Sequence, residues 1–75
     1  MAIRHAWGDK EIVVLEGHET IQNQCEVGDA AVSYFNGEDG AAGWGVTFVG
    51  ENFELNSWNT PFASADEAVE AVLSC

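Results

Sequence analysis

A glycine followed by an acidic residue recurs four times along this chain, at Gly8-Asp9, Gly28-Asp29, Gly37-Glu38 and Gly50-Glu51. Glycine adopts a positive φ without steric cost, which suits the first central position of the type II′ turns that join antiparallel strands. Three of these dipeptides lie between segments of strand-like composition. The spacing therefore predicts short strands connected by tight hairpin turns.

Side-chain alternation supports hairpin pairing at the first and fourth of these dipeptides. Pairing across the first gathers one largely apolar face, made of Ile3, His5, Trp7, Ile12 and Val14. Pairing across the fourth sets Phe48 beside Phe53, and it places Trp58 on the opposite, polar face. The run "EIVVL", residues 11–15, carries apolar side chains at successive positions, which indicates a central strand covered on both faces.

The C-terminal segment "SADEAVEAVLSC" has the pattern of an amphipathic helix over residues 65–74. Ser64 and Glu67 have the spacing of a capping box, and the acids of the first turn suit the helix dipole. Apolar residues follow at helical spacing, namely Ala65, Ala68, Val69, Val72 and Leu73. A helix of this length is marginal alone, so we expect it to pack on the sheet.

These patterns predict an α+β fold in one small domain, residues 1–75. We expect an antiparallel β-meander of four to six strands with the C-terminal α-helix packed on one face. The expected strands cover about residues 2–7, 11–16, 20–27, 30–35, 44–49 and 53–58. For residues 19–27, an amphipathic helix is the alternative to a strand.

The charge balance is strongly acidic and limits the classes of partner. The chain has thirteen Asp and Glu residues and only two basic residues, Arg4 and Lys10, which gives a formal net charge of −11. Such a negative field steers cationic partners toward the protein, and it disfavours direct binding to nucleic acid or to an anionic membrane. We therefore expect a basic protein as the partner.

Motifs of catalysis and metal binding do not stand out in the sequence. His5, His18, Cys25 and Cys75 form no close pair of the kind that zinc sites use, and no nucleophile elbow or phosphate loop is present. We predict a protein that is not an enzyme and that uses no metal or cofactor. The N-terminus does not resemble a signal peptide, and two cysteines suit a reducing compartment, so we expect a cytoplasmic location.

Acids in the predicted turns and strands are the candidate partner-binding residues, together with one tryptophan. Trp58 is either an exposed anchor ringed by acids or folds over Pro61 or Phe62 as a small cluster. The candidates are Glu11, Glu26, Glu38, Asp39, Glu51, Glu54 and Trp58.

The small size, the sheet-plus-helix pattern and the acidic stretches "GDKE", "NGEDG", "GENFE" and "ADEAVE" resemble those of phage- or plasmid-encoded inhibitors of bacterial defence. Such inhibitors include anti-CRISPR proteins and anti-restriction DNA mimics. The resemblance is one of composition and size, without a shared motif. It implies binding, without catalysis, to a basic partner such as a CRISPR complex or a nuclease subunit in the host cytoplasm. Free sheet edges are also compatible with a homodimer. The alternative is an accessory or regulatory domain, antitoxin-like or salt-adapted, whose acidity serves solubility.

Overall fold

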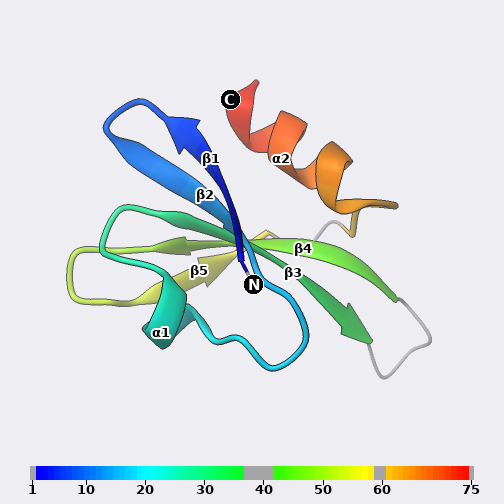
Figure 1. Cartoon of the computed structure of the whole chain (residues 1–75), viewed down its shortest axis with the longest axis horizontal. Coiled ribbons are helices and arrows are strands. Elements are labelled where there is room, and N and C mark those ends of the chain that lie inside the picture. Colours follow the sequence, from blue (N-terminus) through cyan, green and yellow to red (C-terminus); the bar gives the residue numbers. More distant parts are fainter. Residues whose placement is uncertain (1, 37–41, 59–60, 75) are drawn as a thin grey trace.

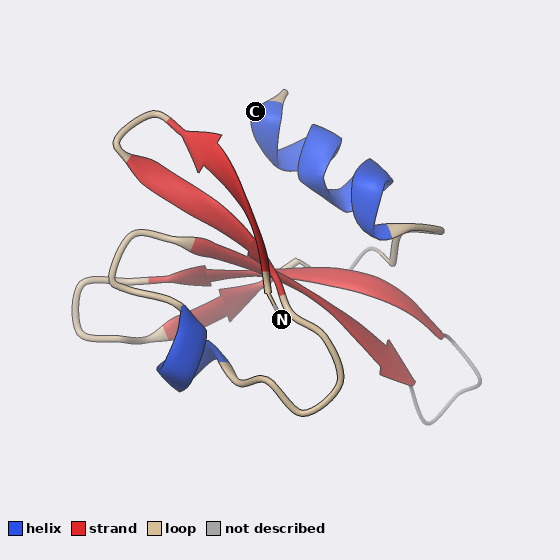
Figure 2. Cartoon of the chain, in the orientation of Figure 1, coloured by secondary structure: helices blue, strands red, loops and turns tan. Residues whose placement is uncertain are grey.

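The computed structural model describes residues 2–36, 42–58 and 61–74. Its five strands form one sheet in the order β1-β2-β3-β4-β5, with a C-terminal helix on one face and a short helix on the other (Figures 1 and 2). The elements are β1 (Ile3–Trp7), β2 (Lys10–Val14), α1 (Ile21–Gln24), β3 (Ala30–Asn36), β4 (Ala42–Val49), β5 (Leu55–Ser57) and α2 (Ala65–Leu73). The fold is therefore largely α+β, as the sequence indicated.

The first hairpin has the predicted register. Trp7 pairs with Lys10 and Ile3 pairs with Val14, so Gly8 and Asp9 form a two-residue turn. Gly8 has a φ of 63° whereas Asp9 does not have a positive φ, as a type II′ turn requires. The prediction that β2 is covered on both sides is also confirmed, because Ile12 and Val13 are both fully buried.

The prediction of a wholly antiparallel meander is wrong at the connection from β2 to β3. These strands pair in parallel, with Ile12 beside Ala30. A parallel pair needs a crossover that returns the chain to the end of the sheet where the first strand began. The predicted strand 20–27 lies in this crossover, and part of it forms α1, where the Thr20 hydroxyl accepts a hydrogen bond from Asn23 N at 3.3 Å. The helical alternative for residues 19–27 is therefore confirmed only at residues 21–24.

The β4–β5 hairpin has a longer loop and a different register from those predicted. Phe48 pairs with Asn56, three residues beyond its predicted partner Phe53. Within the loop, Phe53 N donates to Gly50 O at 2.9 Å and Gly50 N donates to Glu54 O at 2.7 Å. Because the shift is an odd number of residues, it exchanges the faces of the strand. Trp58 consequently packs on the α2 face.

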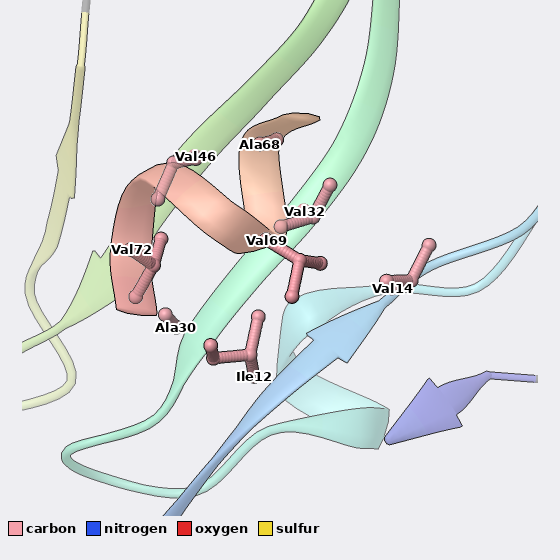
Figure 3. Packing of buried hydrophobic residues seen from close by; sticks show 8 residues of the cluster. All are labelled: Ile12, Val14, Ala30, Val32, Val46, Ala68, Val69 and Val72. Carbon is pink, nitrogen blue, oxygen red and sulfur yellow. The ribbon is translucent and has the colours of Figure 1, made fainter. Parts of the chain in front are cut away.

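The main core lies between α2 and the sheet (Figure 3). Ser64 caps the helix as predicted, since its hydroxyl accepts from Glu67 N at 3.2 Å. The Glu67 carboxylate accepts in turn from Ala63 N at 3.2 Å, one residue before the position that a capping box uses. Leu73 departs from the predicted apolar stripe because it is 52% exposed. The buried residues of this core are Ile12, Val14, Ala30, Val32, Val46, Ala68, Val69 and Val72.

A smaller cluster covers part of the opposite face. Ile21 of α1 and Phe53 of the β4–β5 loop pack against this cluster. Its buried members are Val13, Leu15, Cys25, Ala31 and Val49. Two apolar layers therefore hold the sheet between α2 and the crossover.

Candidate functional site

Three connections meet at one end of the sheet, which we call the turn end. They are the β1–β2 turn at residues 8–9, the segment 26–29 that leads into β3, and the β4–β5 loop at residues 50–54. They meet because β1 and β4 end where β2 and β3 begin, on the left of Figure 1. Two backbone bonds join the second connection to β4, since Gly28 N donates to Val49 O at 2.9 Å and Val49 N donates to Asp29 O at 3.0 Å.

The turn end holds the largest group of acids in the described residues. Eleven of the thirteen acids lie within these ranges, and six of the eleven belong to the three connections or to the first residues of β2. Both cations of the chain, Arg4 and Lys10, lie on β1 and β2, so even this end keeps an excess of negative charge. The six acids are Asp9, Glu11, Glu26, Asp29, Glu51 and Glu54.

Asp29 is the buried acid of this group and fixes two of the predicted binding residues. It is 5% exposed, its Oδ1 accepts from Glu11 N at 3.2 Å, and its Oδ2 accepts from Glu26 N at 2.9 Å. A carboxylate that accepts two backbone N–H groups forms charge-assisted bonds, which are stronger than neutral ones. From the sequence, Asp29 is expected only as a turn residue. The only sequence feature that indicated its role as a buried hydrogen-bond acceptor was its position after a glycine and directly before a strand.

Glu11 is already paired within the protein. Its Oε1 lies 3.3 Å from Arg4 Nη1, and Arg4 Nη2 donates to Gln24 O at 2.8 Å and to Gln24 Oε1 at 3.2 Å. Both charged side chains are substantially exposed, so the pair itself adds little stability. Arg4 nevertheless links β1 to the end of α1 and offsets the charge of Glu11. Glu26, Glu51 and Glu54 are exposed, so they contribute more negative charge to the surface than the paired Glu11 does.

The β4–β5 loop carries two of the predicted binding residues at the turn end. Glu51 and Glu54 are both exposed, and the Glu54 side chain lies over Gly50 in space that a side chain at residue 50 would occupy. Glycine is therefore needed at residue 50 for the Glu54 carboxylate to take this position. Four of the seven predicted residues, Glu11, Glu26, Glu51 and Glu54, thus share one end of the molecule.

The remaining three candidates do not join this group. Trp58 is half-buried on the α2 face, where its ring centroid lies 5.1 Å from that of Phe48 and 6.3 Å from that of Phe62. It therefore packs in an aromatic cluster, as in the second alternative for this residue. Glu38 and Asp39 lie outside the described residues, and Asn36 and Ala42, which flank them, pair at the sheet end opposite the turn end.

The other acids are spread over the rest of the surface. Glu16 and Glu19 follow β2 at the opposite end of the sheet, and Asp66, Glu67 and Glu70 are exposed on α2. Carboxylates thus occur on several sides of the molecule, with their greatest concentration at the turn end.

The one cysteine in the described residues is a free, buried thiol with low reactivity. Burial is the main cause that raises the pKa of Cys25 from 9.0 to about 11, and the nearby Asp29 carboxylate adds to the shift. A thiol with this pKa stays protonated at neutral pH, whereas the thiolate is the nucleophile. Cys25 is therefore a packing residue of the smaller core cluster.

Among the residues that the structure describes, no three or more His, Cys, Asp or Glu side chains come together in a way that could hold a metal ion. Neither helix in the same ranges has the length and apolar character needed to cross a membrane. Comparison of the chain with protein-family models, with curated proteins and with solved structures gave no match.

Proposed function

We propose that this chain is a non-enzymatic binding protein whose turn end docks on a basic, nucleic-acid-handling surface of another protein and blocks it. The observation that carries the proposal is the gathering of Glu26, Glu51 and Glu54 at one end of the sheet from distant parts of the sequence. Because Asp29 and the backbone of β4 hold these connections together, the carboxylates sit on a preorganised framework.

The amount of charge suits competition with nucleic acid. Duplex DNA carries one charge for about every 1.7 Å of its axis, so eleven net charges correspond to roughly 19 Å of duplex. The shortest dimension of the molecule is 23 Å. A partner that binds these carboxylates with its Lys and Arg side chains can no longer use the same side chains for phosphates. Resemblance to inhibitors of bacterial defence favours a CRISPR complex or a nuclease subunit as the partner, in a bacterial cytoplasm.

The test is displacement of labelled duplex DNA or RNA from purified bacterial nucleases and CRISPR complexes, followed by fluorescence anisotropy at low and moderate salt. Two double variants with the same change in net charge separate the turn end from total charge. Glu26→Lys with Glu51→Lys should weaken displacement at least about tenfold. Asp66→Lys with Glu70→Lys on α2 should weaken it only about threefold or less, because rim charges far from a contact act mainly on the association rate.

Two results would count against the proposal. Equal loss in both double variants would show that total charge decides binding and that the turn end has no special role. Failure of the wild-type protein to displace nucleic acid from any of these enzymes would remove the function itself.

A second candidate function is that of an accessory domain whose acidity maintains solubility at high salt. The observation that favours it is the row of exposed acids on α2, away from the turn end. Its distinguishing property is a stability that continues to increase up to molar salt.

A further inference from the structure

Part of the sheet face opposite α2 is left open by the crossover. The smaller core cluster covers this face at Val13, Ala31 and Val49. Farther along β3, β4 and β5, the alternation of the strands places Ser33, Gly45 and Ser57 on the same face. A pocket of about 330 Å³ adjoins these residues, and Phe35 and Thr47 of the same face also line it.

The pocket has an aromatic wall and a hydroxyl wall. A Cβ at residue 45 would lie 3.0 Å from Phe35 Cε1, so the Phe35 ring leans over the bare backbone of Gly45. The hydroxyls of Thr47 and Ser57, two further residues of the pocket lining, lie 2.8 Å apart and hydrogen-bond to each other. Because these hydroxyls satisfy each other, the pocket can accept an apolar side chain without leaving that pair unsatisfied.

The pocket adjoins β5, which is an edge strand. Trp58 N donates to Val46 O and Gly50 N donates to Glu54 O, so residues 54 and 58 direct their backbone groups toward β4. Backbone direction alternates along a strand, and the N–H and C=O groups of Leu55 and Ser57 therefore point away from the sheet. Leu55 is 45% exposed, and β5 contains no charged residue or proline of the kind that protects edges from pairing.

We propose that β5 accepts an extended segment of a basic partner protein as a sixth strand, with an apolar side chain of that segment in the pocket beside Phe35. This inference rests on the proposed function and adds the mode of recognition. Main-chain bonds would supply affinity and the pocket would supply specificity, as in other cases of strand addition.

Charge complementarity selects this occupant over a second copy of the chain. Glu51 and Glu54 precede β5 directly and remain exposed, so Lys or Arg side chains at the end of an added strand would lie close to carboxylates. Two copies, each with a formal charge of −11, would repel each other as their edges approached.

The probe is the blocked peptide Lys-Val-Lys-Leu-Lys-Val-Lys, compared with the same peptide N-methylated at every residue so that it keeps its charge but loses the N–H donors of its residues on both edges. Titration is followed through backbone amide shifts by NMR at about 0.15 M salt. We expect the unmodified peptide to shift the amides of Leu55 and Ser57 and of the pocket residue Phe35. The N-methylated peptide should bind at least about tenfold more weakly.

A pair of variants examines the same edge from the protein side. Ser57→Pro removes the outward N–H of residue 57 and retains the β4 bonds of residues 56 and 58, since proline is tolerated at the open side of an edge strand. Ser57→Ala keeps this N–H and loses only the hydroxyl. Both variants lose the hydroxyl that pairs with Thr47, so the comparison isolates the N–H of residue 57, and we expect peptide binding to be at least about tenfold weaker in Ser57→Pro than in Ser57→Ala.

Equal binding of both peptides, no binding of either, or shifts confined to Asp9, Glu26 and Glu51 would overturn strand addition. None of these results depends on the displacement of nucleic acid, so the proposed function could survive them. Conversely, strand addition together with a failed displacement assay would contradict the proposed function alone. If Ser57→Pro does not fold, the comparison of the two peptides still decides the question.

Discussion

Asp29 has a different role from the exposed acids around it. Its carboxylate is buried and accepts two backbone N–H groups, one at the start of β2 and one before β3. In a protein with a formal charge of −11, removal of an exposed acid relieves repulsion. Removal of Asp29 instead leaves two backbone donors without their partner. Charge alone therefore does not predict the effect of an acidic substitution in this chain.

Asp29→Ala should lower the free energy of unfolding by roughly 2–3 kcal/mol, since a buried group that loses its charged hydrogen-bond partner costs about 1–3 kcal/mol. Asp29→Asn should also destabilise, because one oxygen becomes an NH₂ group that faces an N–H donor. Urea denaturation measures both. The control is Glu70→Ala on the exposed face of α2 beyond its first turn, which should be neutral or slightly stabilising. Similar values for Asp29→Ala and Glu70→Ala would show that the two bonds to Asp29 do not stabilise the fold.

Cys25 should make stability fall at alkaline pH. Its pKa is raised in the folded state from 9.0 to about 11, so the folded protein binds this proton more tightly than the unfolded chain does. The resulting stabilisation is complete below about pH 9 and is lost as pH rises through about 11. Urea denaturation at several alkaline pH values should show this loss, and it should be smaller in Cys25→Ala. An identical pH dependence in both proteins would argue against a raised pKa.

At the scale of the elements, the β4–β5 loop decides which residues face α2. The loop returns the chain through Phe53, which has a φ of 59° and packs its ring on the smaller core cluster. A positive φ is unfavourable for a residue with a Cβ, at about 1 kcal/mol or more. The apolar contact of the ring compensates for this strain, and the longer loop moves Trp58 to the α2 face.

Phe53→Ala and Phe53→Gly should reveal the strain in this loop. Both substitutions remove the ring and its contacts, so both should destabilise the fold. Glycine should be the more stable of the two by about 1 kcal/mol, because it adopts a positive φ without the steric cost of a Cβ. Thermal or urea denaturation of the two variants measures the difference. Alanine is normally the more stable residue within regular structure, so greater stability of Phe53→Ala would indicate a loop without a positive φ at this residue.

At the scale of the whole molecule, the excess of acids destabilises the folded state through self-repulsion. The Debye length falls from about 30 Å at 0.01 M salt to about 8 Å at 0.15 M. The longest dimension of the molecule is 35 Å. At 0.15 M salt most pairs of charges are therefore separated by more than the Debye length, and their repulsion is screened. Further salt can then add little through screening alone.

The melting temperature should therefore rise by a few degrees between about 0.01 M and 0.15 M KCl and change little up to about 1 M. Circular dichroism at the helix and sheet bands follows the transition. In the variant that carries Asp66→Lys and Glu70→Lys, the rise at low salt should be smaller, because fewer charges repel. A melting temperature that keeps increasing at molar KCl would instead favour the salt-adapted accessory domain over the binding protein.

Local patterns in the sequence were sufficient for the elements whose geometry depends on a few neighbouring residues. The two-residue turn at Gly8-Asp9 fixes the register of β1 and β2, and Ser64 with Glu67 begins α2 at the predicted position. Both depend on bonds or dihedral angles within a few positions of each other, so adjacent residue types determine them. The acidic surface likewise follows from composition, because two cations cannot offset thirteen acids.

Tertiary structure decided the features that depend on residues far apart in the chain. The parallel pairing of β2 with β3 turned a predicted strand at residues 20–27 into a crossover, in which Cys25 and Ile21 bury apolar surface against the sheet face opposite α2. The register of β5 moved by an odd number of residues, which buried part of Trp58 and exposed Leu55. The meeting of Glu26 with Glu51 at the turn end arises in the same way, since only the packed sheet brings their loops to one place.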